Sequence, residues 1–186
     1  KNIPKGAGLG GGSSNCATVL KAINQLLGEP LSLEELRDIL KQVSTDSVFF
    51  LYGGTAIGRG RGDLIEPIKP IEITLTLIYP MVEVPTRRIY SAVKGETLTD
   101  RLEEDKIINS LLEGDFSLIE NRLGMLAVEL FPEVGEVFRF LEHLGKRPLV
   151  SGSGSCVFYV GEATEEIKRV ATLRGWRVYE VKSYYG

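Results

Sequence analysis

Cysteine and histidine are scarce in this sequence. Among its 186 residues are two cysteines, Cys16 and Cys156, and one histidine, His143. Two cysteines cannot form the disulfide framework of a small secreted protein or the cysteine-rich ligand set of a zinc site. A lone histidine without a neighbouring cysteine does not indicate a metal centre either. The composition therefore favours a reduced, cytoplasmic protein.

Long apolar runs and an excess of basic charge are also missing. No apolar segment approaches the length of a membrane span, and the formal net charge is −3. General binding to nucleic acid or to an anionic membrane needs a basic surface, so both classes are disfavoured. With 43% hydrophobic and 25% charged residues, the sequence is typical of a globular protein with a sizeable core.

Glycine, in contrast, is concentrated near the start, in the run Pro4–Asn15. Apolar residues then recur at the spacing of one helix face up to Leu27. A glycine loop that leads into a helix N-terminus offers backbone N–H groups and partial positive charge to an anion such as a nucleotide phosphate. The run matches neither the P-loop nor the dinucleotide fingerprint, because Gly-Lys-Ser/Thr is absent and the third glycine would fall on Asn15. The alternative is a flexible glycine linker.

The first part of the chain predicts two helices followed by two strands. Ser13 or Ser14 is the expected N-cap of a helix that runs to Leu27, and Ser32-Leu-Glu-Glu35 is a capping box that opens a helix to Val43. The apolar run 48–52 predicts a buried strand, turned by two glycines to pair with a strand over 55–58. Pro67 and Pro70 then mark the expected domain seam.

The remainder predicts an antiparallel sheet with helices on one face, an α+β fold. Alternating apolar and polar residues predict a strand over 71–78. Further strands are expected over 148–150, 156–160 and 176–182, and helices over 86–93, 101–113, 116–130, 133–144 and 162–174.

Two further segments carry candidate chemistry. Asp46 lies between a predicted helix end and an apolar run, where a carboxylate held rigidly could accept a proton from a substrate hydroxyl. The alternative is a turn aspartate bonded to its own backbone. The run Ser151–Ser155 lies between two predicted strands and is either a plain tight turn or a surface of backbone and hydroxyl groups that contacts a phosphate or a substrate.

Three segments together resemble the GHMP kinases, the family of galactokinase and of homoserine, mevalonate and phosphomevalonate kinases. Pro4–Asn15 resembles the nucleotide-binding motif, Ser44–Phe50 the segment of the catalytic aspartate, and Val150–Phe158 the C-terminal glycine-rich loop. They stand in the family's order and spacing, and the resemblance covers essentially the whole chain. Thr45 and Ser47 depart from the family's usual residues beside the aspartate.

The resemblance implies a two-domain α+β fold. Residues 1–68 would belong to a partial N-terminal domain like the second domain of ribosomal protein S5, and would carry the ATP-binding part. Residues 69–186 would form a ferredoxin-like C-terminal domain. The family's first motif, a Lys-x-Asn strand with the catalytic lysine, has no counterpart in these residues. We therefore expect a truncated copy that is feeble or inactive on its own.

The resemblance also implies ATP- and Mg²⁺-dependent phosphorylation of the 2-hydroxyl of a cytidine diphosphate-linked methylerythritol, a step toward isoprenoids. Asp46 would be the catalytic base, and Tyr90 would stack on the cytosine ring. Gly152, Ser153 and Gly154 would contact the substrate. We expect a cytoplasmic monomer or weak homodimer with no nucleic-acid or membrane partner. The ATP-binding residues would be Pro4, Lys5, Gly6, Ala7, Gly8, Leu9, Gly10, Gly11, Gly12, Ser13, Ser14 and Asn15.

Two alternatives stay open at this point. One is another GHMP kinase that acts on a different alcohol. The other is a non-catalytic nucleotide-binding module on the kinase fold, against which the presence of Asp46 speaks.

Overall fold

The chain divides into two units in the computed structural model, which describes residues 2–95 and 103–184. One unit, here called the helical unit, contains Gly10–Ile71 and the chain end from Ser183. The other, the sheet unit, contains the chain up to Leu9 and Glu72–Lys182. The chain therefore passes from the sheet unit into the helical unit inside the glycine run.

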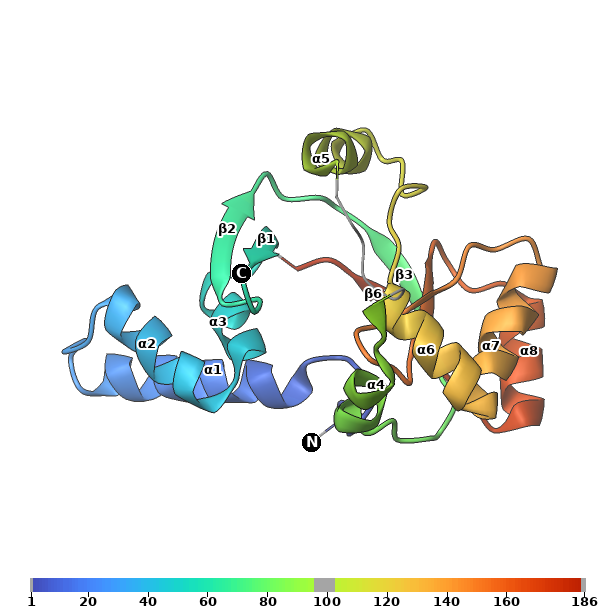
Figure 1. Cartoon of the computed structure of the whole chain (residues 1–186), viewed down its shortest axis with the longest axis horizontal. Coiled ribbons are helices and arrows are strands. Elements are labelled where there is room, and N and C mark those ends of the chain that lie inside the picture. Colours follow the sequence, from blue (N-terminus) through green and yellow to red (C-terminus); the bar gives the residue numbers. More distant parts are fainter. Residues whose placement is uncertain (1, 96–102, 185–186) are drawn as a thin grey trace. The chain divides into compact units, whose positions relative to one another are not determined.

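The helical unit has three helices and a hairpin (Figure 1). The hairpin pairs β1 (Thr55–Arg59) with β2 (Leu64–Ile68) in antiparallel register, Thr55 opposite Ile68. The predicted strand over 55–58 is thus confirmed, with β2 as its partner. The helices are α1 (Gly11–Leu26), α2 (Leu33–Val43) and α3 (Thr45–Tyr52).

Helix α2 begins as predicted, whereas α1 does not. The Ser32 hydroxyl accepts from the N–H of Glu35, and the Glu35 carboxylate accepts from the N–H of Ser32, which completes the capping box. The N-cap of α1 is Gly10, at a φ of 62°, so the prediction of Ser13 or Ser14 is wrong. The left-handed backbone at Gly10 ends the loop and starts the helix earlier than the serine rule indicates.

The prediction of a strand over 48–52 is also wrong, because these residues form the second half of α3. Val48 and Leu51 are buried three residues apart, on the face that packs into the small core with α1 and α2. This burial outweighs the strand preference of a β-branched and aromatic run. Gly53, at a φ of 69°, then ends the helix.

The sheet unit contains a four-stranded antiparallel sheet in the order β4-β5-β3-β6. Helices connect β3 to β4 and β5 to β6, so each pair of parallel strands is separated by an antiparallel one, as in a ferredoxin-like split βαβ fold. This confirms the predicted α+β architecture. The strands are β3 (Thr74–Tyr79), β4 (Leu149–Val150), β5 (Val157–Val160) and β6 (Arg177–Lys182).

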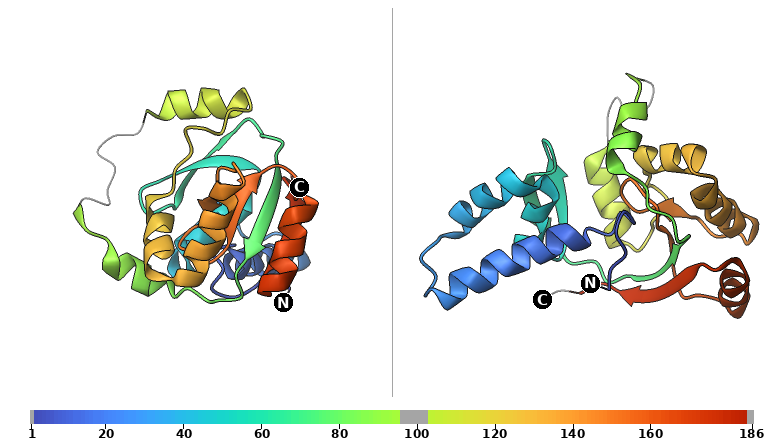
Figure 2. Two further views of the ribbon diagram at one scale, coloured as in Figure 1. Left: turned by 90° about the vertical axis from the view of Figure 1, so that its right-hand side faces the viewer. Right: turned by 90° about the horizontal axis from the view of Figure 1, so that it is seen from below.

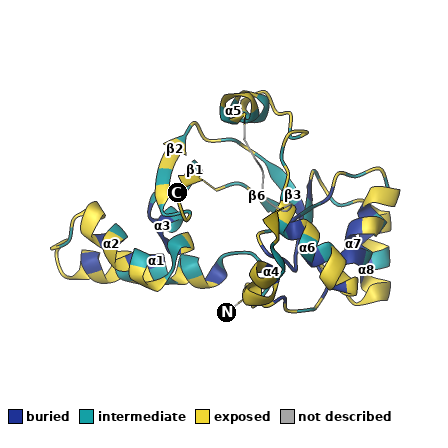
Figure 3. Ribbon diagram, in the orientation of Figure 1, coloured by how far each residue is buried: buried dark blue, intermediate teal, exposed yellow. Residues whose placement is uncertain are grey.

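Helices α6 (Arg122–Leu130), α7 (Pro132–His143) and α8 (Glu165–Arg174) cover one face of this sheet (Figure 2). Ile78, Val157 and Tyr159 point into a core shared with these helices. Figure 3 shows that buried positions gather along α6 and α7, whereas many positions of α1 and α2 in the helical unit are exposed. Several of these exposed residues are apolar. The other helices among the described residues of the sheet unit are α4 (Thr86–Ala92) and α5 (Glu104–Leu112), and α5 has no buried residue.

The helix predicted over 116–130 is wrong in its first part, since α6 begins only at Arg122. The Asp115 carboxylate accepts from the N–H and the hydroxyl of Ser117, and the Arg147 guanidinium donates to the carbonyls of Phe116 and Ile119. These contacts hold the segment as turns. The first two residues of the helix predicted over 101–113 lie outside the described part of the chain. Over the described ranges, no helix combines the length and apolar character needed to cross a bilayer.

Candidate active site

The first half of the glycine run lies on the sheet face opposite the helices. Ala7 and Leu9 pack there against the side chains of Tyr79, Tyr179 and Cys156. These three side chains point to the sheet face opposite the helices, because successive residues of a strand alternate between its two faces. Ala7 is fully buried, at 1% exposure. The loop is therefore held against the sheet by its apolar residues, with glycines between them.

Hydrogen bonds fix the carbonyl groups of this loop. The N–H groups of Val84 and Ser155 donate to the Gly6 carbonyl at 3.0 and 3.2 Å. The N–H of Cys156 donates to the Ala7 carbonyl at 3.1 Å, and the Ser151 hydroxyl donates to the Gly8 carbonyl at 2.9 Å.

A trans peptide unit directs its N–H opposite to its C=O. With the carbonyls of residues 6–8 held in this way, the N–H groups of Ala7, Gly8 and Leu9 point away from the groups that hold the loop. This orientation suits an anion that approaches the N–H edge of the loop.

The helical unit supplies the other half of the run. Gly10 caps α1, no side chain hydrogen-bonds to this end of the helix within the described residues, and its first turn has no acidic residue. The first N–H groups of a helix have no intrahelical acceptor, so this end presents donors and partial positive charge. A Cβ on Gly10 would lie 2.9 Å from the Phe50 ring of α3, which shows how closely α3 approaches.

Asp46 lies exposed in the first turn of α3. The hydroxyl of Ser44, the residue before α3, lies 3.3 Å from the hydroxyl of Ser13 in the first turn of α1. Asp46 and Phe50 are four residues apart and so share one helix face, and Phe50 contacts Gly10. The start of α3, with its carboxylate, therefore adjoins the start of α1 (Figure 1).

The residue after Asp46 carries a buried hydroxyl. Ser47 has 0% exposure, and its Oγ has no hydrogen-bond partner among the described residues. A buried hydroxyl without a partner costs about 1–3 kcal/mol of stability. The departure from the family pattern at this position therefore weakens the helical unit.

Replacement of Ser47 with alanine is expected to raise the unfolding free energy by about 1–2 kcal/mol, because it removes the unpaired hydroxyl and improves helix propensity. Urea titration followed by circular dichroism would measure the change. Ser32→Ala is the matched control, since it deletes a hydroxyl that caps α2 and should lower stability by about 1 kcal/mol. Equal losses in both variants would contradict the account of Ser47.

The run Ser151–Ser155 connects β4 to β5 and closes on the glycine loop through Ser151 and Ser155. Ser153 is buried, and its hydroxyl lies 3.1 Å from the hydroxyl of Thr86. Gly154 is also buried, whereas Gly152 is exposed. The run is a tight turn that packs against the glycine loop, and its predicted contact with a phosphate or a substrate stays a prediction.

Tyr90 lies on α4 with 62% of its surface exposed and takes no part in the core. Sequence reasoning missed one polar residue near the loops, Asn121, which caps α6 and contacts the segment 150–152. The signal for it was an asparagine, a preferred N-cap residue, directly before an apolar helical pattern.

Cys156 is completely buried beneath the glycine loop, and burial raises the pKa of its thiol to about 12. An unfolded chain would ionise this thiol at about pH 8.5. The folded state thus favours the neutral thiol, and the stability gained from it is present below pH 8.5 and is lost as the pH rises toward 12.

We expect the unfolding free energy to fall by about 2 kcal/mol between pH 8 and pH 10 because of this thiol. Comparison of denaturant midpoints for the natural chain and Cys156→Ala would isolate the effect, since other groups titrate equally in both. Parallel pH profiles for the two proteins would rule it out.

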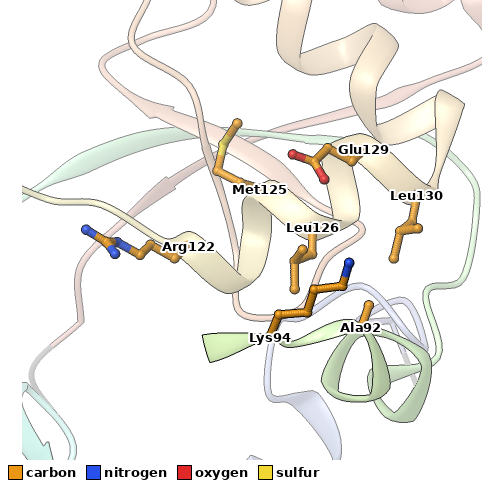
Figure 4. Close-up of a pocket in the computed structure, with 7 residues that line it drawn as sticks. All are labelled: Ala92, Lys94, Arg122, Met125, Leu126, Glu129 and Leu130. Atoms are coloured by element: carbon orange, nitrogen blue, oxygen red, sulfur yellow. The ribbon is translucent and has the colours of Figure 1, made fainter. Parts of the chain in front are cut away.

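A surface groove is present in each unit. One, of about 660 Å³, lies between α4 and α6 in the sheet unit (Figure 4). The other, of about 450 Å³, lies between α1 and α2 and is mostly apolar. The lining of the first groove consists of Ala92, Lys94, Arg122, Met125, Leu126, Glu129 and Leu130.

Among residues 2–95 and 103–184, no cluster of three or more histidine, cysteine, aspartate or glutamate side chains could hold a metal.

The chain is similar to known proteins over nearly its whole length. Residues 1–54 match the GHMP kinases N terminal domain. The chain is 46% identical over 183 residues to a 4-diphosphocytidyl-2-C-methyl-D-erythritol kinase of Persephonella marina, and 44% identical over 184 residues to that of a Hydrogenobaculum species. These alignments cover 96% and 98% of this chain but 66% and 64% of the relatives, so the chain spans just under two thirds of their length.

A solved structure agrees with these relatives. The crystal structure of a 4-(cytidine 5'-diphospho)-2C-methyl-D-erythritol kinase superposes with a TM-score of 0.82 at 35% identity. It aligns with 100% of this chain, which covers 69% of that protein. The similarity therefore extends over both the helical unit and the sheet unit.

Proposed function

This chain belongs to the GHMP kinase family, and on that premise we propose that the protein containing it transfers the γ-phosphoryl group of ATP to the 2-hydroxyl of 4-diphosphocytidyl-2-C-methyl-D-erythritol. The observation that carries the proposal is 44–46% identity, over nearly the whole chain, to kinases named for this substrate. We further propose that the protein works in the cytoplasm as a monomer or weak homodimer.

In this proposal the residues Pro4–Asn15 bind the phosphates of ATP. The fixed carbonyls of residues 6–8 turn the N–H groups of the loop outward, and the start of α1 adds uncapped N–H groups. Positive φ values at Gly6, Gly8 and Gly10 are available to glycine without strain. Both features support close contact between backbone and phosphate.

The proposed role of Asp46 is to accept the proton of the substrate hydroxyl. A general base of this kind contributes about 10²–10⁴-fold to a rate, provided that it is held in place. The exposed position of Asp46 in the first turn of α3, beside the start of α1, supports that role. We propose that Tyr90 stacks on the cytosine ring, in keeping with its exposed ring, and that residues 152–154 line the substrate site.

We expect Mg²⁺ to bind together with ATP. It is usually held by substrate phosphates, waters and one or two carboxylates, so it does not require a dedicated cluster of acidic residues. When bound, the ion would neutralise charge that develops on the transferred phosphoryl group. The role proposed for Asp46 is proton transfer, not metal binding.

The test is a phosphate-transfer assay with the full-length protein that contains this chain. Labelled ATP is offered with 4-diphosphocytidyl-2-C-methyl-D-erythritol, mevalonate or homoserine. We expect kcat/KM for the first to exceed the others by at least about a hundredfold. A preference for mevalonate or homoserine would assign the protein to another branch of the family. Binding of ATP with no turnover on any alcohol would indicate a non-catalytic module.

A further inference from the structure

Asn121 uses every polar group of its side chain. Its Oδ1 accepts from the N–H of Gly124 at 2.9 Å, which caps α6. Its Nδ2 donates to the carbonyls of Val150 and Gly152, each at 2.7 Å. An asparagine that only capped a helix would need the first of these bonds alone. The two donor bonds hold the residues on either side of Ser151.

The start of α6 lies unusually close to the end of β4. A Cβ on Gly124 would fall 2.6 Å from the Val150 Cβ and 2.8 Å from the Asn121 Nδ2. Glycine inside a helix costs about 0.5–1 kcal/mol relative to alanine, so its presence here serves the close approach. This approach brings the Asn121 amide within reach of both carbonyls.

Ser151 continues the chain of contacts to the glycine loop. Its hydroxyl donates to the Gly8 carbonyl at 2.9 Å, and the neighbouring N–H groups of Ser155 and Cys156 donate to Gly6 and Ala7. The contact between Ser151 and Gly8 joins residues 143 positions apart in the sequence. Asn121 thus acts on the glycine loop through the segment 150–156 and touches none of its residues in these bonds.

We propose that Asn121 is a positioning residue for the phosphate-binding loop. By holding the carbonyls of Val150 and Gly152, its amide fixes Ser151 in the place from which it holds Gly8, and so keeps the loop N–H groups oriented for phosphate. The effect on ATP rests on the function proposed above. The effect on the two loops does not depend on it.

Two substitutions separate this role from helix capping. Asn121→Ser and Asn121→Asp both retain an oxygen for the Gly124 N–H, and asparagine, aspartate and serine are nearly equal as N-caps. Serine loses the two amide donor bonds without adding charge. Aspartate also replaces the donor by a charged acceptor that faces two carbonyl oxygens. If Asn121 served only as the N-cap of α6, both substitutions would leave the glycine loop nearly unchanged. Aspartate would even suit the helix N-terminus, because its negative charge interacts favourably with the helix dipole.

The first measurement is amide hydrogen exchange in the full-length protein, under conditions in which each variant is folded. The N–H groups of Ser155 and Cys156 report directly on the contact with Gly6 and Ala7. We expect their exchange to accelerate about tenfold in Asn121→Ser, and more in Asn121→Asp. Thr164→Ala, which removes the N-cap of α8 in the same unit, is the matched control and should leave both rates unchanged.

The second measurement is the KM for ATP beside kcat. We expect KM to rise about tenfold in Asn121→Ser and further in Asn121→Asp, with kcat changed less than KM. Natural exchange rates at both amides, or a natural KM alongside faster exchange, would overturn the proposal. If Asn121→Asp does not fold, Asn121→Ser decides alone. Wild-type protein without kinase activity would refute the proposed function, and the exchange rates would still decide whether Asn121 holds the two loops together.

Discussion

Asp46→Asn is expected to lower kcat of the full-length protein by about 10²–10⁴-fold, while the KM values for ATP and for the alcohol change by less than about threefold. Asparagine matches aspartate in size and can occupy the same place in the first turn of α3. It cannot accept a proton from the substrate hydroxyl, so the loss falls on the chemical step. Steady-state kinetics with both substrates varied would separate kcat from KM.

Asp38→Asn is the control for this experiment. Asp38 is an exposed carboxylate of α2 that pairs with Arg37 and Lys41, so its replacement removes the same charge from the same unit. Turnover should remain at the natural level in Asp38→Asn. Full turnover in Asp46→Asn would remove Asp46 from the mechanism and leave it as an aspartate that stabilises the first turn of α3.

Gly8→Ala is expected to separate the two glycine-rich loops of the sheet unit. A Cβ at this position would lie 1.9 Å from the Ser151 carbonyl oxygen, and the φ of 73° is itself unfavourable for alanine. Because neither backbone can yield by a side-chain rotation, the loops must move apart. We expect the KM for ATP to rise by at least about tenfold and the unfolding free energy to fall by roughly 2–4 kcal/mol.

Gly175→Ala separates the backbone strain from the collision. Gly175 has the same φ of 73°, lies in the same unit, and has no atom within 4 Å of an added Cβ in the described structure. Its replacement should cost about 1–2 kcal/mol of stability without changing the KM for ATP. Equal effects of the two substitutions on stability and on KM would argue against a specific role of the contact between Gly8 and Ser151.

Features that depend on neighbouring residues were predictable from the sequence. The capping box at Ser32 and Glu35, the alternating strand β3 and the end of helix α8 at residue 174 all formed as expected. Each is determined by contacts within a few residues, which is the range over which sequence patterns carry information. The anion-binding role that the composition of the glycine run indicates stays a prediction.

Features that depend on distant contacts were not predictable. Residues 48–52 became helical because two other helices bury one face of them, and residues 116–119 stay non-helical because Arg147 holds their carbonyls from 28–31 positions away. The approach of α3 to Gly10, which places Asp46, and the bond from Ser151 to Gly8 are of the same kind. The local patterns of a single sequence carry no information about contacts between residues that are far apart in the chain.

The exposed apolar side of α1 and α2 has a consequence for handling the 186-residue chain in the laboratory. Val19, Ile23, Leu26 and Val43 leave between 49% and 86% of their surface in water, on the helices that line the smaller groove. A formal net charge of −3 gives weak mutual repulsion between copies. Association between copies through this apolar surface, rather than unfolding, therefore limits the concentration at which the polypeptide remains in solution.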